Sequence, residues 1–575
     1  MNKSIVSLAV TAVITMTPAV HAAADNSTLI VNEVIVVSGK KPDQTLNELA
    51  GSIAVTTAQE IERHLVTDMN KLFKYDPSIV VTGASGTAQN FVIRGMGGDR
   101  VLMIKDGMRM NEGYGANGAN DIVGRGFIDV DTLKQVEVAK GAASSLYGAD
   151  ALGGIVVFTT KDPQDYLAND DFYASIKTGY SSESSQRNIG TTLAFNTGEF
   201  GHVLNITRRD GHEQKNYFDS KTPLALDSTS IFYKTVYHFN QQQQLKFSAD
   251  LWQQNARSDV ASTLAQYFRG LADYGYIITA ENRTGEQENN SYKLSFHDQV
   301  SRSWSDQFNI ALYSNKTRQQ DVEFVNLDIN APMFGVVGVR DMWANYDYQQ
   351  QTIGLISNGV KKFTLDEIGH TVGFGLDIER TNSIRSMHEY RVQNGQVIKD
   401  TTSDKYPEND ILRAGLFIND TIEINDKVQL IGGLRWDQYT MDPKKGTKSD
   451  GYQYQEINEQ QLSPNLAIIV DLSKNVSTYA QFAKGFKVPA YDLAYLDHDN
   501  SRYGYKIIPT DKLNPERSDS FEVGLRGNAG DFSFSSAIFY NEYNDFINIA
   551  LIRQEDSNGD GTNDIDVFQY DNLDK

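Results

Sequence analysis

From residue 166 onward the chain consists largely of short segments in which apolar and polar residues alternate with a period of two. The clearest runs are Ile231/Tyr233/Thr235/Tyr237/Phe239 against Lys234 and His238, Leu245/Phe247/Ala249/Leu251 against Lys246/Ser248/Asp250, Val428/Leu430/Gly432/Leu434/Trp436 against Gln429/Arg435/Asp437, and Phe532/Phe534/Ser536/Ile538/Tyr540. This period places successive side chains on opposite faces of a β-strand. Segments of about ten residues with one apolar face are typical of strands that cross a bilayer around a hydrated interior. A soluble β-sandwich has the same period, so the N-terminal region must decide between the two.

The connections between these segments are of two kinds. Short ones at residues 196–198 and 528–530 contain Asn and Gly, and long polar ones occupy Ala256–Asn290, Arg318–Asn345 and Met441–Glu459. Short turns at one end and long loops at the other are typical of outer-membrane barrels. We count about fifteen strand-like segments, against the ~22 of outer-membrane transporters. Because the chain ends in mid-pattern at Lys575, we expect a barrel that lacks roughly seven C-terminal strands.

The N-terminus has the three parts of a secretory signal peptide. Lys3 precedes an apolar run from Ile5 to Val20, and the small residues Ala22–Ala24 follow. A charged start, a short apolar stretch and a small-residue cleavage site are removed together on secretion. Threonines and a proline within the run argue against a membrane anchor. We assign residues 1–24 to a signal peptide and place the mature chain outside the cytoplasm.

Residues Val136–Pro163 read VEVAKGAASSLYGADALGGIVVFTTKDP, two apolar β-runs joined by glycine and other small residues. Taken alone, they predict a tight hairpin, because glycine permits turns with positive φ. The order EVxKGxxSxLYGxxALGGxVxxxTKDP resembles the end of the plug domain of TonB-dependent outer-membrane receptors, although Ala142 stands where the family usually has proline. The resemblance implies an all-β transmembrane barrel (about 22 strands when complete, C-terminally truncated here) with an N-terminal α/β plug domain. It places the plug at 46–165 and the barrel at 166–575.

The preceding segment also fits a plug. Thr57 and Glu60 have the spacing of a capping box at the start of a short helix. Glycine pairs at 97–98 and the Asp106–Gly107 pair predict turns between β-runs. The run FVIRGMGGDRVL from residue 91 resembles the plug, and family members use its arginine in buried ionic contacts with the barrel wall, which gives Arg94 that role. Tyr114 lies in a Gly/Asn-rich stretch that resembles the apical loops facing the ligand.

An acidic residue followed by β-branched residues lies between the signal peptide and the plug. The segment is Glu33-Val34-Ile35-Val36-Val37, within a polar stretch at 25–45. Such a segment can add a strand to the sheet edge of another protein, although an ordinary first strand of the plug would look the same. Its position resembles the TonB box, which implies a TonB-type inner-membrane energy-coupling protein as partner.

The stretch Ala483–Glu516 bears on the cargo. GFKVP at 485–489 and PTDKLNPE at 509–516 resemble, imperfectly, the paired motifs of haem and haemoglobin receptors, and His498 lies between them. An imidazole can be an axial ligand of haem iron, with the aromatic neighbours Tyr495 and Tyr503 covering the porphyrin. A solvated loop histidine is the alternative. His64 is the histidine of the plug region, and it falls on a predicted helix, with Tyr114 as a substitute ligand. A ferric siderophore receptor therefore remains an open alternative.

A second candidate metal site lies near the C-terminus. Asp556, Asn558, Asp560, Thr562 and Asp564 have the order of oxygen ligands in a calcium loop, with Gly561 at the sharp turn. Val567 occupies the position of the usual bidentate glutamate, so an acidic hairpin loop without calcium is the alternative. No prosthetic group is predicted; haem is expected as transported ligand.

Composition excludes several function classes. The net charge of −21 argues against a nucleic-acid partner, and the absence of cysteine excludes disulfides and cysteine-ligated zinc. The chain has no HExxH, GxSxG or P-loop motif, so we predict no enzyme. The sequence predicts a TonB-dependent importer in the bacterial outer membrane, in contact with its lipid. Its expected cargo is an iron-containing nutrient, most favourably haem or a haem protein; a non-transporting adhesin is the alternative class.

Overall fold

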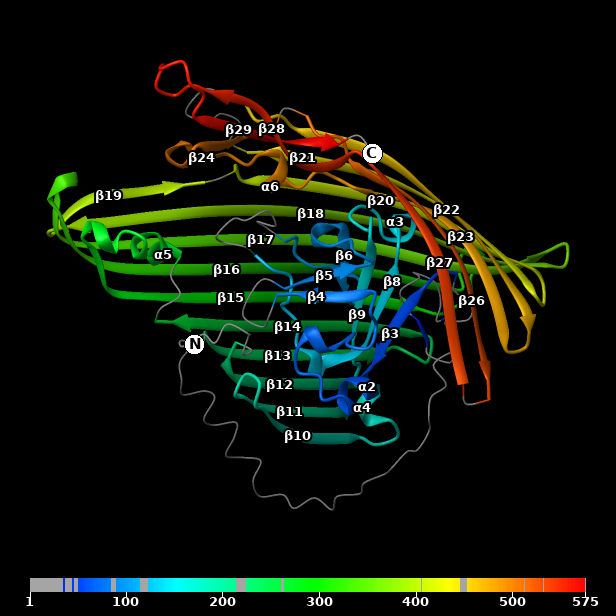
Figure 1. The fold of residues 1–575 in the computed structure, drawn as a ribbon. Helices are drawn as coiled ribbons and strands as arrows, with labels where there is room; N and C mark the ends of the chain where they lie inside the picture. The colour runs from blue at the N-terminus through cyan, green and yellow to red at the C-terminus, as the bar shows by residue number, and fades with distance from the viewer. Residues whose placement is uncertain are drawn as a thin grey trace, which may run out of the picture.

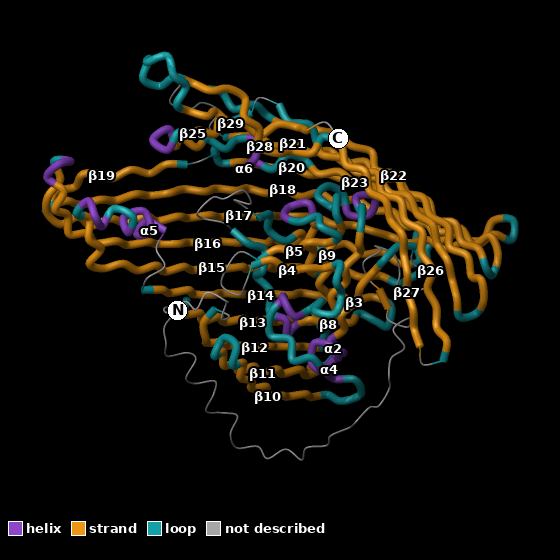
Figure 2. The backbone as a smooth tube through the Cα atoms, viewed as in Figure 1, coloured by secondary structure: helices purple, strands orange, loops and turns teal. Residues whose placement is uncertain are grey.

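A wide curved sheet partly surrounds a small N-terminal domain, as the computed structural model shows (Figure 1). Figure 1 places the blue and cyan N-terminal elements within the curve of the green-to-orange strands. Figure 2 shows that strands dominate the curved sheet and that the enclosed domain combines strands with helices and loops. The structure describes residues 35–36, 44–45, 50–83, 89–113, 123–213, 224–259, 263–404, 406–444, 452–510, 512–530 and 532–573.

The curved sheet, here called the wall, is antiparallel and contains sixteen strands. Fifteen of them pair in sequence order, and β19 pairs separately with the far end of β18. Within the described residues, β10 and β27 each pair with one neighbour. The fifteen-strand path agrees with the number predicted from alternation. The strands are β10 (Phe172–Ser181), β11 (Gln186–Thr197), β12 (Phe200–His212), β13 (Ala225–His238), β14 (Gln243–Ser258), β15 (Tyr276–Asp298), β16 (Gln307–Ala331), β17 (Val336–Leu365), β18 (Ile368–Gln393), β19 (Gln396–Ser403), β20 (Asn409–Asn425), β21 (Val428–Pro443), β22 (Ile457–Ser473), β23 (Val476–Lys487), β26 (Glu516–Ala529) and β27 (Phe532–Asn544).

Alternating burial along the wall follows the alternating sequence. On β13, Phe232, Lys234 and Val236 are buried, and the side chains between them are more exposed on the outer face. On β14 the buried residues include Ser248 and Asp250, and Phe247, just before Ser248, is exposed. Because the period is two, every second side chain faces the enclosed domain. The predicted division into an apolar outer and a polar inner face is confirmed.

The prediction of long polar loops is wrong for residues 318–345 and for residues 256–290. Residues 318–345 continue β16 and β17, and the one-turn 3₁₀ helix η7 (Pro332–Phe334) lies between them. Residues 256–290 include the end of β14, helix α5 (Thr263–Arg269), the 3₁₀ helix η6 (Ala272–Tyr274) and the greater part of β15. The polar residues there belong to strands that extend past the apolar band. These strands continue to pair with their neighbours in the antiparallel sheet along this part. Polarity alone therefore did not distinguish loop from extended strand.

The enclosed domain, here called the plug, has an order of elements that matches the sequence prediction. Its five-stranded sheet has the order β3-β8-β9-β6-β7, with β6 and β9 parallel. A separate hairpin, β4–β5, packs beside it. The elements are β3 (Ile53–Thr57), α2 (Ala58–Arg63), η3 (Met69–Lys71), β4 (Ile79–Thr82), β5 (Asn90–Ile93), η4 (Gly98–Arg100), β6 (Val101–Lys105), β7 (Met108–Arg109), η5 (Val130–Thr132), β8 (Leu133–Lys140), α3 (Ser144–Tyr147), β9 (Gly154–Thr160) and α4 (Gln164–Leu167).

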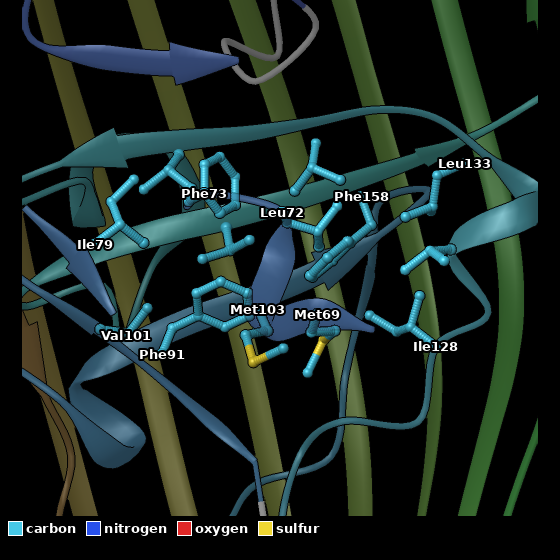
Figure 3. Close-up of a cluster of buried hydrophobic side chains, with 14 of the residues drawn as sticks. Met69, Leu72, Phe73, Ile79, Phe91, Val101, Met103, Ile128, Leu133 and Phe158 are labelled. Atoms are coloured by element: carbon cyan, nitrogen blue, oxygen red, sulfur yellow. The ribbon is translucent and has the colours of Figure 1, made fainter. Parts of the chain in front are cut away.

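Local signals in the plug sequence act as predicted. Thr57 accepts a hydrogen bond from the Glu60 backbone N–H, and the Glu60 carboxylate accepts one from the Thr57 N–H, which completes the capping box of α2. Asp106 and Gly107 both adopt positive φ between β6 and β7, as a tight hairpin turn requires. Figure 3 shows the apolar core of the plug, where Phe91, Val101, Met103 and Phe158 are buried among its strands. The plug therefore has a hydrophobic core of its own.

The end of the wall that carries the longer connections holds a second small sheet. It has the order β24-β25-β29-β28, with β25 and β29 parallel, and Figure 1 shows it at the top left, at the same end as α5 and β19. None of the helices in the described ranges is long and apolar enough to cross a membrane. The elements here are α5 (Thr263–Arg269), η6 (Ala272–Tyr274), α6 (Tyr491–Ala494), β24 (His498–Asn500), η8 (Ser501–Tyr503), β25 (Tyr505–Ile508), β28 (Phe546–Glu555) and β29 (Ile565–Leu573). The two short strands β1 (Ile35–Val36) and β2 (Gln44–Thr45) precede the plug.

Candidate functional site

Buried ion pairs join the plug to the inner face of the wall. Glu522 and Glu516 of β26 bind Arg94 and Arg100 of the plug, and residues of β12, β14, β18 and β20 contribute further pairs. We call these ion pairs anchors. Each anchor has a charged residue at an inward position of a strand, where burial without a partner would be costly. Further pairs include Lys105–Asp250, Arg209–Asp129, Arg209–Asp131, Arg413–Glu112 and Arg109–Glu379.

Arg94 makes one of the most enclosed of these contacts. Its Nη1 donates to Glu522 Oε2 over 2.7 Å, and the side chains are 9% and 3% exposed. The same carboxylate accepts hydrogen bonds from Tyr479 Oη (2.6 Å) and Ser52 Oγ (2.8 Å). The Arg94 guanidinium lies 3.8 Å from the ring centroid of Phe539. Sequence reasoning named Arg94 but not Glu522, whose signal was a carboxylate at an inward position of β26.

On the long-connection side of the plug, five tyrosines pack together; we call Tyr348, Tyr406, Tyr439, Tyr491 and Tyr495 the tyrosine cluster. All are at most 3% exposed. The hydroxyls of Tyr348 and Tyr491 are 2.7 Å apart, and the rings of Tyr406 and Tyr491 are tilted with centroids 5.0 Å apart. Tyr495 donates its hydroxyl to the Gln455 carbonyl over 2.6 Å. The cluster forms an aromatic layer between the plug and the small sheet.

The predicted haem ligand lies on that small sheet. His498 is half-buried on β24 and pairs with Ile507 of β25. Its ring contacts Tyr505, with centroids 5.8 Å apart, and sequence reasoning missed this neighbour. Tyr495 instead contacts Tyr454, and Tyr503 is exposed and contacts Tyr267. The aromatic partner of His498 could have been found only from the pairing of β24 with β25.

The acidic neighbours of His498 are occupied locally. Asp499 accepts hydrogen bonds from the Ser501 hydroxyl (2.6 Å) and the Ser501 backbone N–H (2.9 Å). These bonds hold the pKa of Asp499 below its usual value, with a smaller contribution from Lys506. The plug histidine, His64, ends helix α2 and stacks near Tyr75, with centroids 5.2 Å apart. His64 therefore lies in the plug body, as its predicted place on a helix implied.

Several predicted residues lie outside the described ranges. Tyr114 is one, and of the predicted TonB box only Ile35 and Val36 are described. These two residues form β1, which pairs antiparallel with Gln44 and Thr45 of β2. Glu33, Val34 and Val37 are outside the described residues.

The candidate calcium loop is organised by its own backbone. Asp556 accepts hydrogen bonds from the N–H groups of residues 558, 559, 560 and 561. Asp560 accepts from the Thr562 N–H, and Asp564 accepts from Ser557. Backbone donation, foremost from Gly561, lowers the pKa of Asp556. In the part of the chain that the structure describes, no three His, Cys, Asp or Glu side chains are grouped as a metal site. Calcium binding by this loop stays a prediction.

Two family models match the chain, one for each part of the fold. The model described as "TonB dependent receptor-like, beta-barrel" matches residues 232–575, and the "TonB-dependent Receptor Plug Domain" matches residues 45–155. The chain belongs to the TonB-dependent receptor family. The resemblance found in the plug motif is thereby confirmed, and the barrel match covers more than half of the chain. Outer-membrane receptors and transporters, not enzymes, make up this family.

Individual relatives differ in cargo. Haemoglobin-binding protein A of Haemophilus influenzae is 29% identical over 264 residues, which are 42% of this chain and 26% of that protein, so the match spans about a quarter of the relative. The vitamin B12 transporter BtuB of Vibrio vulnificus is 24% identical over 95% of this chain and 75% of its own.

Solved structures share the fold. The haemophore receptor HasR of Serratia marcescens, in complex with its haemophore HasA and haem, superposes with a TM-score of 0.71 at 18% identity, covering 92% of this chain and 77% of HasR. The ferric enterobactin receptor PfeA of Pseudomonas aeruginosa gives 0.65 at 16% identity over the same shares. At these identities the likeness concerns the fold alone.

Proposed function

We propose that this protein imports an iron-containing nutrient, haem or haem carried by a protein, across the bacterial outer membrane with energy supplied through a TonB-type partner. The observation that carries the transport proposal is a separately folded plug held within the wall by buried ion pairs. Such a plug obstructs the interior, and ion pairs can exchange partners with water when the plug moves. A receptor that served only for adhesion would have no use for a displaceable plug.

In this proposal the segment Glu33–Val37 is the TonB contact. Val36→Pro removes a backbone N–H that strand pairing requires, so uptake should be lost while cargo binding to whole cells is unchanged. Ile30→Pro, outside the proposed segment, is the matched control and should import normally. Uptake by the Val36 variant at the wild-type rate would refute the assignment of this segment.

Haem is the cargo that the site supports best. His498 presents an imidazole beside the Tyr505 ring, above an aromatic layer, at the end of the wall that bears the long connections. An imidazole can be an axial ligand of haem iron, and aromatic rings can pack against a porphyrin. The haemoglobin-binding relative supports the same class. In this proposal Tyr503 and Tyr495 contribute aromatic surface to the ligand site, and Tyr114 stays a predicted ligand contact.

Growth on a single iron source is the test of cargo. Cells that depend on this receptor should grow on haem or haemoglobin and fail on ferric siderophores. Growth on a siderophore alone would replace the haem proposal by the siderophore alternative and leave the transport proposal standing. Binding without energy-dependent growth on any source would instead favour the adhesin.

Spectroscopy tests the ligand. The full-length receptor should bind haem with an absorption spectrum typical of imidazole coordination, and His498→Ala should change that spectrum and weaken binding. His388→Ala is the matched control, because His388 is at the same end of the wall and pairs with Asp400 over 2.8 Å. Equal spectral changes in both variants would exclude His498 as the specific ligand.

A further inference from the structure

A cavity of about 360 Å³ lies between the plug and the wall, on the opposite side of the plug from the tyrosine cluster. Its wall residues come from the parts of β13–β18 nearest the short turns, and its plug residues include those of β6, β9 and the hairpin turn at Asp106–Gly107. Ile104, Val157 and Ile356 provide apolar lining. This volume is at the lower end of the range for small-molecule sites in proteins.

The charged residues that line the cavity are four lysines (Lys134, Lys234, Lys246 and Lys293) and Arg109, against four carboxylates (Asp106, Asp162, Asp377 and Glu379). Lys234 and Lys246 both donate to Asp162, over 2.9 and 2.6 Å. Lys293 donates to the Asp106 backbone carbonyl, and within the described residues it has no carboxylate within 4.0 Å. Burial raises the pKa of the Asp106 carboxyl. The positive charges of Lys234 and Lys293 outweigh this effect of burial and hold the pKa of Asp106 below its usual value. Asp106 and Asp162 are therefore charged near neutral pH. With five cationic side chains against four carboxylates, the lining has a formal excess of one positive charge.

A buried polar contact separates this cavity from the tyrosine cluster. Arg109 of β7 donates through Nε to Glu379 of β18 and through Nη1 to Asp150, each over 3.0 Å. Tyr313 Oη donates to the other oxygen of Glu379 over 2.6 Å. Arg109 also lines two smaller spaces, which Arg413 and a member of the tyrosine cluster, Tyr439, line as well. The Arg109–Glu379 pair thus lies between the two regions.

We propose that the lysine cavity is a transit site for an amphiphilic organic anion, which passes the plug once the Arg109–Glu379 pair opens. The apolar lining accepts the body of such a molecule, and the lysines accept its carboxylates as charge-assisted partners. This inference rests on the proposed import function and names the chemical class of cargo at a second place on its route. It predicts that cargo binding at the outer end and passage through the cavity respond to different residues.

Residues 1–575 contain no cysteine, so thiols introduced among them allow a direct test. Ile356→Cys places a single thiol in the cavity of the full-length receptor, and Ala467→Cys places one in a different plug–wall space, where the nearby Lys140 is paired with Asp76. Each variant is treated in cells with an anionic (sulfonatoethyl) and a cationic (trimethylammonioethyl) methanethiosulfonate. A local positive excess should favour the anionic reagent at position 356 by about tenfold. At position 467 the two rates should be similar.

The role of the charge is tested with Lys293→Met and Lys293→Arg in the Ile356→Cys background. Met should abolish the anionic preference and lower haem uptake severalfold at unchanged haem binding, and Arg should restore both. Equal reagent rates at position 356, or an unchanged preference in the Met variant, would overturn the transit site. The labelling preference does not depend on haem being the cargo, so persistence of the preference without haem uptake would refute only the proposed cargo.

Discussion

The Arg94–Glu522 contact gives an asymmetric prediction for the stability of the docked plug. Arg94→Met leaves the Glu522 carboxylate with two hydroxyl donors, Tyr479 at 2.6 Å and Ser52 at 2.8 Å. Glu522→Gln leaves the Arg94 guanidinium without a carboxylate in the described residues, facing the ring of Phe539 at 3.8 Å. The carboxylate therefore retains better partners than the guanidinium does.

The magnitudes follow from burial. Removing one partner of a buried ion pair costs about 3–5 kcal/mol when the other is left uncompensated, and we expect Glu522→Gln to fall in this range. Each hydroxyl donor retained by Glu522 offsets part of that cost, because hydrogen bonds to charged groups contribute about 1.5–3 kcal/mol. Arg94→Met should therefore cost only about 2 kcal/mol. The double variant should cost less than the sum of the two.

The assay uses a thiol reporter in the plug core. Val138 is fully buried on β8 in the core of the plug, so a Val138→Cys thiol becomes reactive only when that core unfolds. Reactivity against urea concentration gives the free energy of plug unfolding, to which the contacts with the wall contribute, for the parent and for each variant. Equal costs for the two single variants, or additive costs in the double variant, would show that the pair does not hold the plug as described.

Two further predictions use the same reporter. Lys234 and Lys246 lower the pKa of Asp162 in the folded protein despite the burial of this carboxyl. The stability that Asp162 contributes to the plug is therefore present above the unfolded pKa of 3.8, and it is lost as the pH falls below 3.8 toward the lower folded pKa. Asp162→Asn should weaken the plug at neutral pH and make plug stability less dependent on acid. Gly148→Ala should cost more than about 1 kcal/mol, because Gly148 has φ +81° and an added Cβ would lie 2.8 Å from Arg435 Nη2. Gly98→Ala, with φ +66° and open space, should cost less, and the reverse order would contradict the packing argument.

The sequence predicts those features of the fold that depend on local chemistry. The period of two gave the wall strands and their faces, because side chains on a strand alternate whatever the strand pairs with. Thr57 and Glu60 predicted the start of α2 correctly, and Asp106–Gly107 predicted a turn in which both residues adopt positive φ. The glycine-rich motif after Val136 identified the family because small residues there lie against the wall, as Gly148 does against Arg435.

The features that the sequence did not predict depend on contacts between distant segments. The length of β16 and β17 follows from ladder partners along the whole strand, which polar side chains do not reveal. Glu522 is paired with a residue 428 positions away, and Tyr505 meets His498 only through the pairing of β24 with β25. Lys234, Lys246 and Lys293 come from three different wall strands and meet the plug at the lysine cavity. No local sequence pattern therefore identifies this cavity.

The plug topology connects a pull on the N-terminal segment to the anchor at Glu522. The chain enters the plug at β3, an edge strand whose one partner among the described strands is β8, and Ser52 immediately before it donates to Glu522. A pull from the N-terminus therefore acts first on the Ser52 hydrogen bond and on the ladder between β3 and β8. Arg109 lies on β7 at the opposite edge of the same sheet, so peeling β3 alone leaves the Arg109–Glu379 pair in place. Opening that pair requires the sheet to move as a body, which its apolar core favours, because displacement exchanges polar wall contacts for water whereas unfolding would expose the core.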